Sequence, residues 1–168
     1  MDRAALGKIV LQLKATLENV TNLLLVGEGF RWYLKMKSGS CGEISEKWQY
    51  IRLTDCVELK GGRGNTSMVQ KCKLCAWENS VDILSSTIKS YNAEDNEKFK
   101  TTVEFECLGL EPVDYQPQAG FATEGVESGT VFSDISLHRK DWDFINTHTK
   151  KGFPHLLSNC QLHVSLPV

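Results

Sequence analysis

The sequence predicts an all-β fold of short strands, arranged as two similar small units of the β-sandwich or barrel type. Three observations predict it. Apolar and polar residues alternate with a period of two in several segments, which is typical of half-buried strands. Clusters of Gly, Asn, Asp and Pro separate most of these segments, as turns require. No helical periodicity of any length precedes about residue 138.

The first predicted strand shows the longest alternation. Polar residues occupy every second position from Gln12 to Glu18. The apolar residues that alternate with them, and continue the pattern towards the N-terminus, are Ile9, Leu11, Leu13, Ala15 and Leu17. One face of this strand is therefore expected to be buried.

The next strands are predicted from composition. Residues 30–37 (FRWYLKMK) and 47–53 (KWQYIRL) are rich in aromatic and β-branched residues. Residues 60–67 form a glycine-rich loop that lacks the Lys-Ser/Thr ending of a phosphate-binding loop, so we interpret it as a connection. Residues 68–88 then predict a strand, a turn with two cysteines and another strand.

The segment 99–115 alternates again, with Val103, Phe105 and Cys107 on one face. It also forms a weak internal repeat with the segment that starts at Phe30, in which Ser38 corresponds to Cys107. This repeat predicts two similar β units that meet near the polar stretch KSYNAEDNEK.

We therefore expect a first β unit with a zinc knuckle at residues 7–90 and a second β unit at residues 91–142. The C-terminal segment, residues 143–168, is expected to be irregular. Its last residues, QLHVSLPV, have an alternative as a paired strand, which would cover an otherwise exposed sheet edge.

Composition and charge are those of an ordinary soluble globular protein. The chain of 168 residues is long enough to bury a core, and its net charge of −2 provides no global basic field for nucleic acid or an acidic membrane. No apolar run approaches about 18 residues, so we expect no membrane span. Gln12, Lys14 and Glu18 interrupt the apolar run near the N-terminus, so we expect no signal peptide either. The six cysteines are then expected as reduced thiols or metal ligands in a cytoplasmic protein.

Two short motifs carry the candidate chemistry. The motif CKLC contains Cys72 and Cys75, and two residues between thiols let a tight turn direct both sulfurs at one ion. The alternative to a metal site is a chance pair of small buried residues. The motif SGSC has the same spacing but begins with Ser38 and ends with Cys41, so Cys41 is the natural third ligand and Ser38 occupies the fourth position.

A serine in this position is expected to weaken the site. A structural zinc ion requires four ligands at tetrahedral corners, and a hydroxyl does not ionise near neutral pH as a thiol with a pKa of about 8.5 can. Water or Ser38 could fill the fourth corner, Cys56 or Cys107 could replace it, or zinc could be lost. Outside such a site, Cys56, Cys107 and Cys160 are interpreted as small buried residues or surface thiols.

Five motifs in order carry a resemblance to a known family. They are GKIVLQLKATLENVTNL, FRWYLKMKSGSCGEISEKWQYI, LKGGRGNTSMVQKCKLC, FKTTVEFECLGLEPVDYQPQAGF and VESGTVFSDISL…KDW. From about Gly7 to Trp142 the chain resembles the eukaryotic CXXC-motif-containing zinc-binding protein family, long described as a domain of unknown function. The resemblance implies two similar β units, a single zinc held by two CxxC pairs, a small cytosolic protein and no known catalytic activity.

The chain departs from this family pattern in two places. The first CxxC reads Ser38-x-x-Cys41, and the ending from about Arg139 is basic and rich in histidine where the family carries an acidic stretch. A diverged copy or an isoform would account for both departures.

We therefore expect a non-catalytic protein that binds one Zn²⁺ per chain as a structural staple, weakly or not at all because of Ser38. Its β surfaces are expected to bind a protein partner, with a role in metal homeostasis as the extension. A thiol oxidoreductase using Cys72 and Cys75 is one alternative, although the helix that such thiols require is not predicted. A nucleic-acid-binding zinc ribbon is another, and the net charge and the lack of interleaved basic and aromatic residues argue against it. We expect no nucleic-acid partner and no membrane partner.

Overall fold

The computed structural model describes residues 6–39, 41–58, 65–71, 78–116, 119–127, 129–135, 137 and 156–165. Strands are the dominant secondary structure of these residues, which confirms the predicted all-β class. The strands are β1 (Leu6–Glu18), β2 (Val20–Leu25), β3 (Trp32–Ser38), β4 (Gln49–Ile51), β5 (Val57–Glu58), β6 (Asn65–Thr66), β7 (Met68–Lys71), β8 (Glu78–Leu84), β9 (Lys100–Leu108), β10 (Leu110–Gln116), β11 (Phe121–Gly125), β12 (Val131–Ile135) and β13 (Leu156–Ser165). Two short 3₁₀ turns, η1 (Ser85–Thr87) and η2 (Ala93–Asp95), accompany them.

The strands form four antiparallel sheets. The largest has the order β13-β1-β9-β8-β7, and the others have the orders β10-β3-β4, β12-β11-β2 and β5-β6. The five-stranded sheet takes strands from all three predicted segments, which therefore share backbone hydrogen bonds. The predicted boundaries at residues 90 and 142 stay a prediction.

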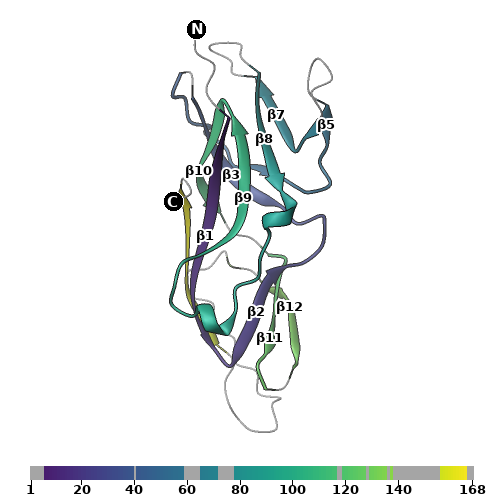
Figure 1. Cartoon of the computed structure of the whole chain (residues 1–168), viewed down its shortest axis with the longest axis vertical. Helices are drawn as coiled ribbons and strands as arrows, with labels where there is room; N and C mark the ends of the chain where they lie inside the picture. The colour runs from purple at the N-terminus through teal and green to yellow at the C-terminus, as the bar shows by residue number, and fades with distance from the viewer. Residues whose placement is uncertain are drawn as a thin grey trace.

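The long strand β1 connects two hydrophobic cores. Ile9 and Leu11 belong to the first core and Leu13, Ala15 and Leu17 to the second, so burial of the five predicted inward residues is confirmed. Val10 is buried as well. Strands β2, β11 and β12 lie at one end of the elongated molecule, and β7 and β8 extend towards the other (Figure 1). The first core also contains the inward side chains of β3, β8 and β9, which are Trp32, Leu34, Met36, Val81, Ile83, Val103, Phe105 and Cys107.

The polar stretch 89–98 is a tightly anchored connection. Tyr91 is fully buried within it, and its backbone pairs with Leu23 of β2 through two hydrogen bonds. The Tyr91 hydroxyl accepts a hydrogen bond from the Ala15 N–H at 3.2 Å and lies 2.7 Å from the Lys98 carbonyl oxygen, to which it can donate. Composition alone did not predict this anchor, because one aromatic residue among nine others leaves the stretch polar on average.

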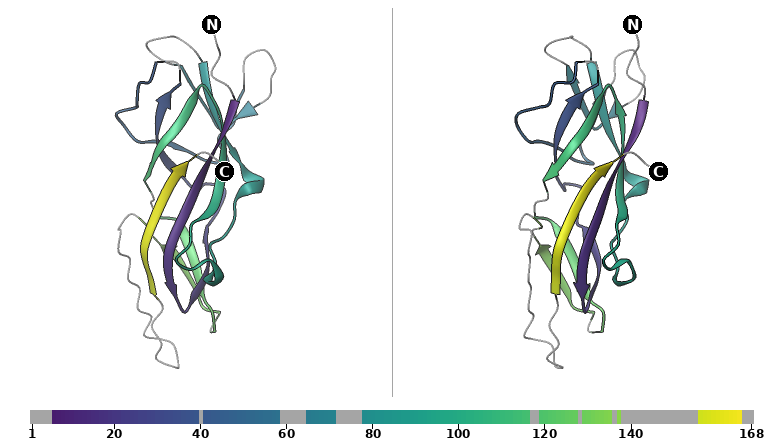
Figure 2. Two further views of the ribbon diagram at one scale, coloured as in Figure 1. Left: turned by 60° about the vertical axis from the view of Figure 1, so that its left-hand side comes forward. Right: turned by 90° about the vertical axis from the view of Figure 1, so that its left-hand side faces the viewer.

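The prediction of an irregular C-terminal segment is wrong for residues 156–165. These residues form β13, which pairs with β1 in antiparallel register from Leu156 opposite Glu18 to Ser165 opposite Val10. Figure 2 shows β13 in yellow along β1 in purple. The paired strand considered as the alternative is therefore what forms. The physical reason is that, without β13, the long strand β1 would present an unpaired edge.

Among the described residues, no helix is long and apolar enough to cross a membrane.

The Tyr91 anchor yields a stability prediction. Replacing Tyr91→Phe removes the hydroxyl and leaves the buried Ala15 N–H without its partner, so the free energy of unfolding should fall by about 1–3 kcal/mol. Urea unfolding followed by circular dichroism measures the change. The control is Tyr50→Phe, since Tyr50 is 43% exposed. Equal stability of the Tyr91 and Tyr50 variants would show that the hydroxyl does not hold this connection in place.

Candidate metal centre

The turn between β9 and β10 joins the two sheets that carry the cysteine motifs. Leu108 pairs with Ser80 of β8, and Leu110 pairs with Ser38 of β3. Gly109 lies between them with a φ of +72°, a left-handed backbone conformation that favours glycine. This turn therefore holds the end of β3 close to the start of β8.

The first cysteine motif forms a closed turn at the end of β3. The Ser38 N–H donates to the Glu43 carbonyl oxygen at 2.9 Å, and the Gly42 N–H donates to the Ser38 carbonyl oxygen at 2.8 Å. Gly42 has a φ of +73°, a left-handed backbone conformation that favours glycine. Ser38 is buried and Cys41 is exposed. The turn thus leaves the Cys41 thiol accessible to a metal ion.

The same turn is bonded to the Gly109 corner. The Gly39 N–H donates to the Gly109 carbonyl oxygen at 2.9 Å. A Cβ atom on Gly109 would lie 2.2 Å from the Oδ1 atom of Asn79, a buried residue at the start of β8. The first turn, the Gly109 corner and the Asn79 side chain at the start of β8 are therefore in close contact.

The second cysteine motif is bracketed by β7 and β8. Lys71 pairs with Glu78 and Gln70 with Asn79, so the two strands are held in register up to both ends of the connection that contains the motif. Cys72 and Cys75 lie outside the described residues. In the sequence, Lys71 directly precedes Cys72, and Glu78 follows Cys75 by three positions.

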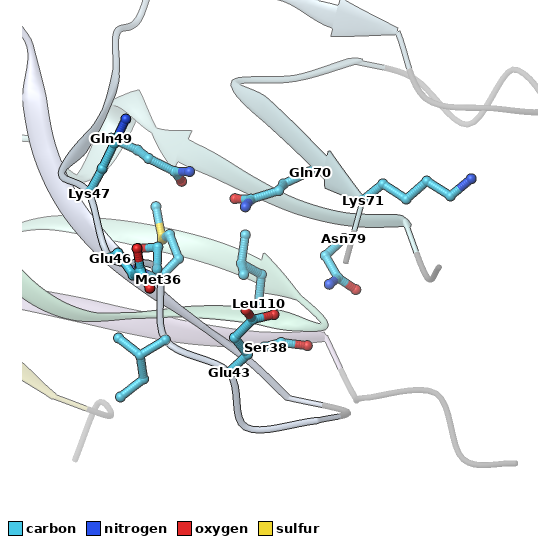
Figure 3. Close-up of a pocket in the computed structure, with 12 residues that line it drawn as sticks. Met36, Ser38, Glu43, Glu46, Lys47, Gln49, Gln70, Lys71, Asn79 and Leu110 are labelled. Atoms are coloured by element: carbon cyan, nitrogen blue, oxygen red, sulfur yellow. The ribbon is translucent and has the colours of Figure 1, made fainter. Parts of the chain in front are cut away.

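Ser38 of the first motif and residues that flank the second motif border one pocket of about 400 Å³. Ser38 and Glu43 from the first turn line one side, and Lys71 and Asn79 from the bracketing strands line the other (Figure 3). Cys41 is not among the lining residues. The structure therefore brings Ser38 and the ends of β7 and β8 that flank the second motif to the same space, although they are some thirty residues apart in the sequence.

The other two predicted candidates for a fourth ligand differ from Cys41. Cys107 is 5% exposed in the first core, and burial, together with Glu111 and Glu106, raises its pKa to about 12. It is a small buried residue and is poorly suited to bind a metal as a thiolate. Cys56 is an exposed thiol in the connection between β4 and β5. The side chain of Cys160, in β13, is outside the described residues.

The donor set fits zinc in part. Among the residues that the structure describes, no group of three or more His, Cys, Asp or Glu side chains could hold a metal ion. A complete set at this pocket would thus consist of Cys41, Cys72 and Cys75, with a buried hydroxyl at Ser38 in the fourth position. Three thiolates suit zinc, and the hydroxyl is the weak member.

Sequence reasoning missed three residues that shape this region. Gly109 and Asn79 form the corner, and Gln70 faces the pocket beside Lys71. A signal existed for Gly109, because a lone glycine between two alternating segments is typical of a turn with positive φ. The positions of Asn79 and Gln70 depend on pairing between distant strands, which no local pattern reveals.

Comparison with known proteins identifies close relatives. The family model described as CXXC motif containing zinc binding protein, eukaryotic, matches residues 10–151. The protein of that name from Rattus norvegicus is 80% identical over 147 residues, which cover 88% of this chain and 92% of the relative. The one from Homo sapiens is 80% identical over 137 residues, which cover 82% of this chain and 86% of the relative.

Two solved structures are also similar. One is described as "Crystal Structure of C1orf123": it has a TM-score of 0.90 and 69% identity and covers 96% of this chain and 100% of its own. A hypothetical protein from Plasmodium falciparum has a TM-score of 0.84 at 22% identity, over 95% of this chain and 99% of its own, which supports the fold alone. Since the family match ends at residue 151, β13 lies outside it.

The Gly109 corner can be tested by mutation. Gly109→Ala places a side chain in the left-handed region, at a cost of about 1–2 kcal/mol, and adds the contact with Asn79. We expect a larger loss of unfolding free energy than the backbone term alone. The double variant Gly109→Ala/Asn79→Ala should lose less unfolding free energy than the sum of the losses in the two single variants, because it relieves the contact. Simple additivity in urea unfolding would contradict this packing.

The buried thiol predicts a pH dependence. An unfolded chain loses the Cys107 proton near its ordinary pKa of 9.0, whereas the folded chain retains it up to about 12. Between these values the unfolded state binds fewer protons, so stability falls as pH rises. Urea unfolding between about pH 9 and about pH 11 should show a shallower decline for Cys107→Ala than for the parent chain. Parallel curves for the two proteins would show that this thiol does not titrate differently on folding.

Proposed function

Because the chain belongs to the eukaryotic CXXC motif containing zinc binding protein family, we propose that it binds one zinc ion at the pocket between β3 and β7–β8. Cys41, Cys72 and Cys75 would supply the thiolates, with Ser38 or water at the fourth corner. The observation that supports the proposal is the shared pocket, which Ser38 borders together with Lys71 and Asn79 of the strands that flank the second cysteine motif.

The proposed zinc ion acts as a structural staple. One ligand turn follows β3 of a three-stranded sheet, and the other connects two strands of the five-stranded sheet. When bound, the metal supplies a cross-link between the two sheets at the end of the first core. Structural zinc contributes about 10–16 kcal/mol in small finger peptides, and a site with three thiolates should contribute less.

Ser38 explains why the site would be weak and not absent. The residue is 5% exposed, and its N–H closes the ligand turn through Glu43, as a cysteine in the same position would do. This burial and hydrogen bond support the proposal that a cysteine would fit the same position and that only the donor atom differs. A hydroxyl keeps its proton near neutral pH, so it offers the metal no full negative charge.

We propose no catalytic role for the cysteines. A redox thiol with a low pKa typically lies at a helix N-terminus, and the described residues contain only two 3₁₀ turns, η1 and η2. Reduced cysteines as ligands also fit a cytoplasmic location, which we include in the proposal; Cys56 and Cys107 are free thiols. A reversible Cys72–Cys75 disulfide in a redox titration would contradict the non-catalytic role.

Nucleic-acid binding is not proposed, although basic and aromatic residues do interleave on one sheet face. The guanidinium groups of Arg31 and Arg52 lie 4.7 and 5.6 Å from the centre of the Tyr50 ring. The neighbouring acidic residues balance much of this charge: Asp55 forms an ion pair with Arg52 at 2.9 Å, and Asp114 is opposite Lys35 in the strand pairing. A balanced face lacks the positive groove that single strands require.

Metal analysis of matched variants tests the proposal. We expect the parent chain to lose zinc to a mild chelator more readily than Ser38→Cys, because the fourth thiolate completes the site. The melting temperature of the zinc-loaded Ser38→Cys protein should rise by about 2–4 °C for each kcal/mol gained. Cys41→Ser should lose zinc, and Cys56→Ser is the control that should retain it. Equal zinc retention by the parent, Ser38→Cys and Cys41→Ser proteins would overturn the assignment.

A further inference from the structure

Two glutamines face each other across the pocket that borders the proposed metal site. Gln49 comes from β4 and Gln70 from β7, and each of these strands is at the edge of its sheet among the described residues. Their carboxamide groups point towards one another in Figure 3, while the Lys71 ammonium group is directed away from them. No element of the described sheets pairs with the outer edge of either strand.

Both amide oxygens lack a hydrogen-bond partner. The Oε1 atoms of Gln49 and Gln70 are buried, and neither accepts a hydrogen bond. A buried polar atom without a partner is costly, and most such atoms in folded proteins are satisfied. Two of them on opposite walls of one pocket therefore indicate a ligand that donates hydrogen bonds to both sides.

The rest of the pocket does not favour a strongly charged ligand. Its apolar part is formed by Met36, Ile44 and Leu110, of which Ile44 is 51% exposed. The charged residues that line it, Glu43, Glu46, Lys47 and Lys71, balance in sign. A pocket of about 400 Å³ is within the usual range for ligand sites. The combination suits a neutral ligand with an apolar body and N–H donors on two sides.

We propose that this pocket binds a short extended segment of a partner protein, whose backbone pairs with the Gln49 and Gln70 carboxamides. In an extended chain, the N–H and C=O groups of one residue point to one edge and those of the next residue to the opposite edge. A carboxamide offers one acceptor and two donors, so it can pair with both groups of one residue. Two glutamines on opposite walls match two successive residues of such a segment.

The location between two edge strands supports the same occupant. Extended peptides commonly bind at sheet edges, where main-chain hydrogen bonds supply affinity and side-chain pockets supply specificity. The segment would lie beside Ser38 and Lys71, next to the proposed metal site, but none of the contacts invoked for it involves the metal.

A peptide titration tests the inference. The probe is a blocked trialanine, N-acetylated and N-methylamidated, added to the ¹⁵N-labelled full chain. We expect saturable chemical-shift changes in β4, β7 and the turn from Ser38 to Ile44. The matched peptide with methylated backbone nitrogens has a similar body without N–H donors and should give no saturable change.

The corresponding protein variant is Gln49→Met/Gln70→Met, which keeps side-chain length and removes both carboxamides. Binding of the trialanine should weaken by about tenfold or more, with thermal stability equal to or above that of the parent because two unpartnered oxygens are gone. Gln12→Met, on β1 and outside the pocket, is the control that should bind as the parent does.

Three results would overturn the inference: no saturable change in the parent, equal binding by the double variant, or equal binding of the methylated peptide. Zinc content measured on the same samples separates this test from the metal proposal, because the double variant retains every proposed zinc ligand.

Discussion

The Gly109 corner is the constraint on which this region depends. Its left-handed φ of +72° allows β9 to end and β10 to begin within one residue, so that one turn pairs with β8 on one side and with β3 on the other. Its carbonyl oxygen also accepts the Gly39 N–H, which fixes the start of the first cysteine turn. A residue with a side chain at this position would contact the buried Asn79 and open the corner.

Zinc and peptide would use this geometry in different ways. The metal would join the Ser38 turn to the β7–β8 connection at the end of the first core, where two sheets meet without sharing strand pairs. The two glutamines lie further along the same space, on β4 and β7. A serine in place of a cysteine at position 38 weakens the proposed metal site but leaves Gln49 and Gln70 unchanged. Metal binding and peptide binding can therefore be separated by mutation.

The sequence predicted local features well and distant ones poorly. The alternation from Ile9 to Leu17 located β1, and the inward residues of β9 followed from the same period, because side-chain direction in a strand is a local property. The 89–98 stretch was expected to be a boundary, but burial of Tyr91 depends on its contact with β2. The prediction of an irregular ending was wrong for β13, because the partner of this strand, β1, lies some 150 positions earlier in the chain.

The candidate site shows the same division. Residue type and spacing identified Ser38 and Cys41 as one turn, and the hydrogen bonds from Gly42 and Ser38 close that turn. They could not identify Gln49 and Gln70, since a glutamine in an amphipathic strand has the pattern of an ordinary solvent-facing residue. Only the meeting of two sheet edges makes their amide oxygens buried and unpartnered.

The central claim is that both cysteine turns supply ligands to one ion. X-ray absorption at the zinc edge of the loaded chain tests it most directly, because it counts the sulfur neighbours of the metal. We predict three sulfurs at about 2.3 Å and one lighter donor, nitrogen or oxygen, at about 2.0–2.2 Å, with a fourth sulfur in Ser38→Cys. A spectrum with two sulfurs or fewer, unchanged in Ser38→Cys, would contradict convergence of the two turns.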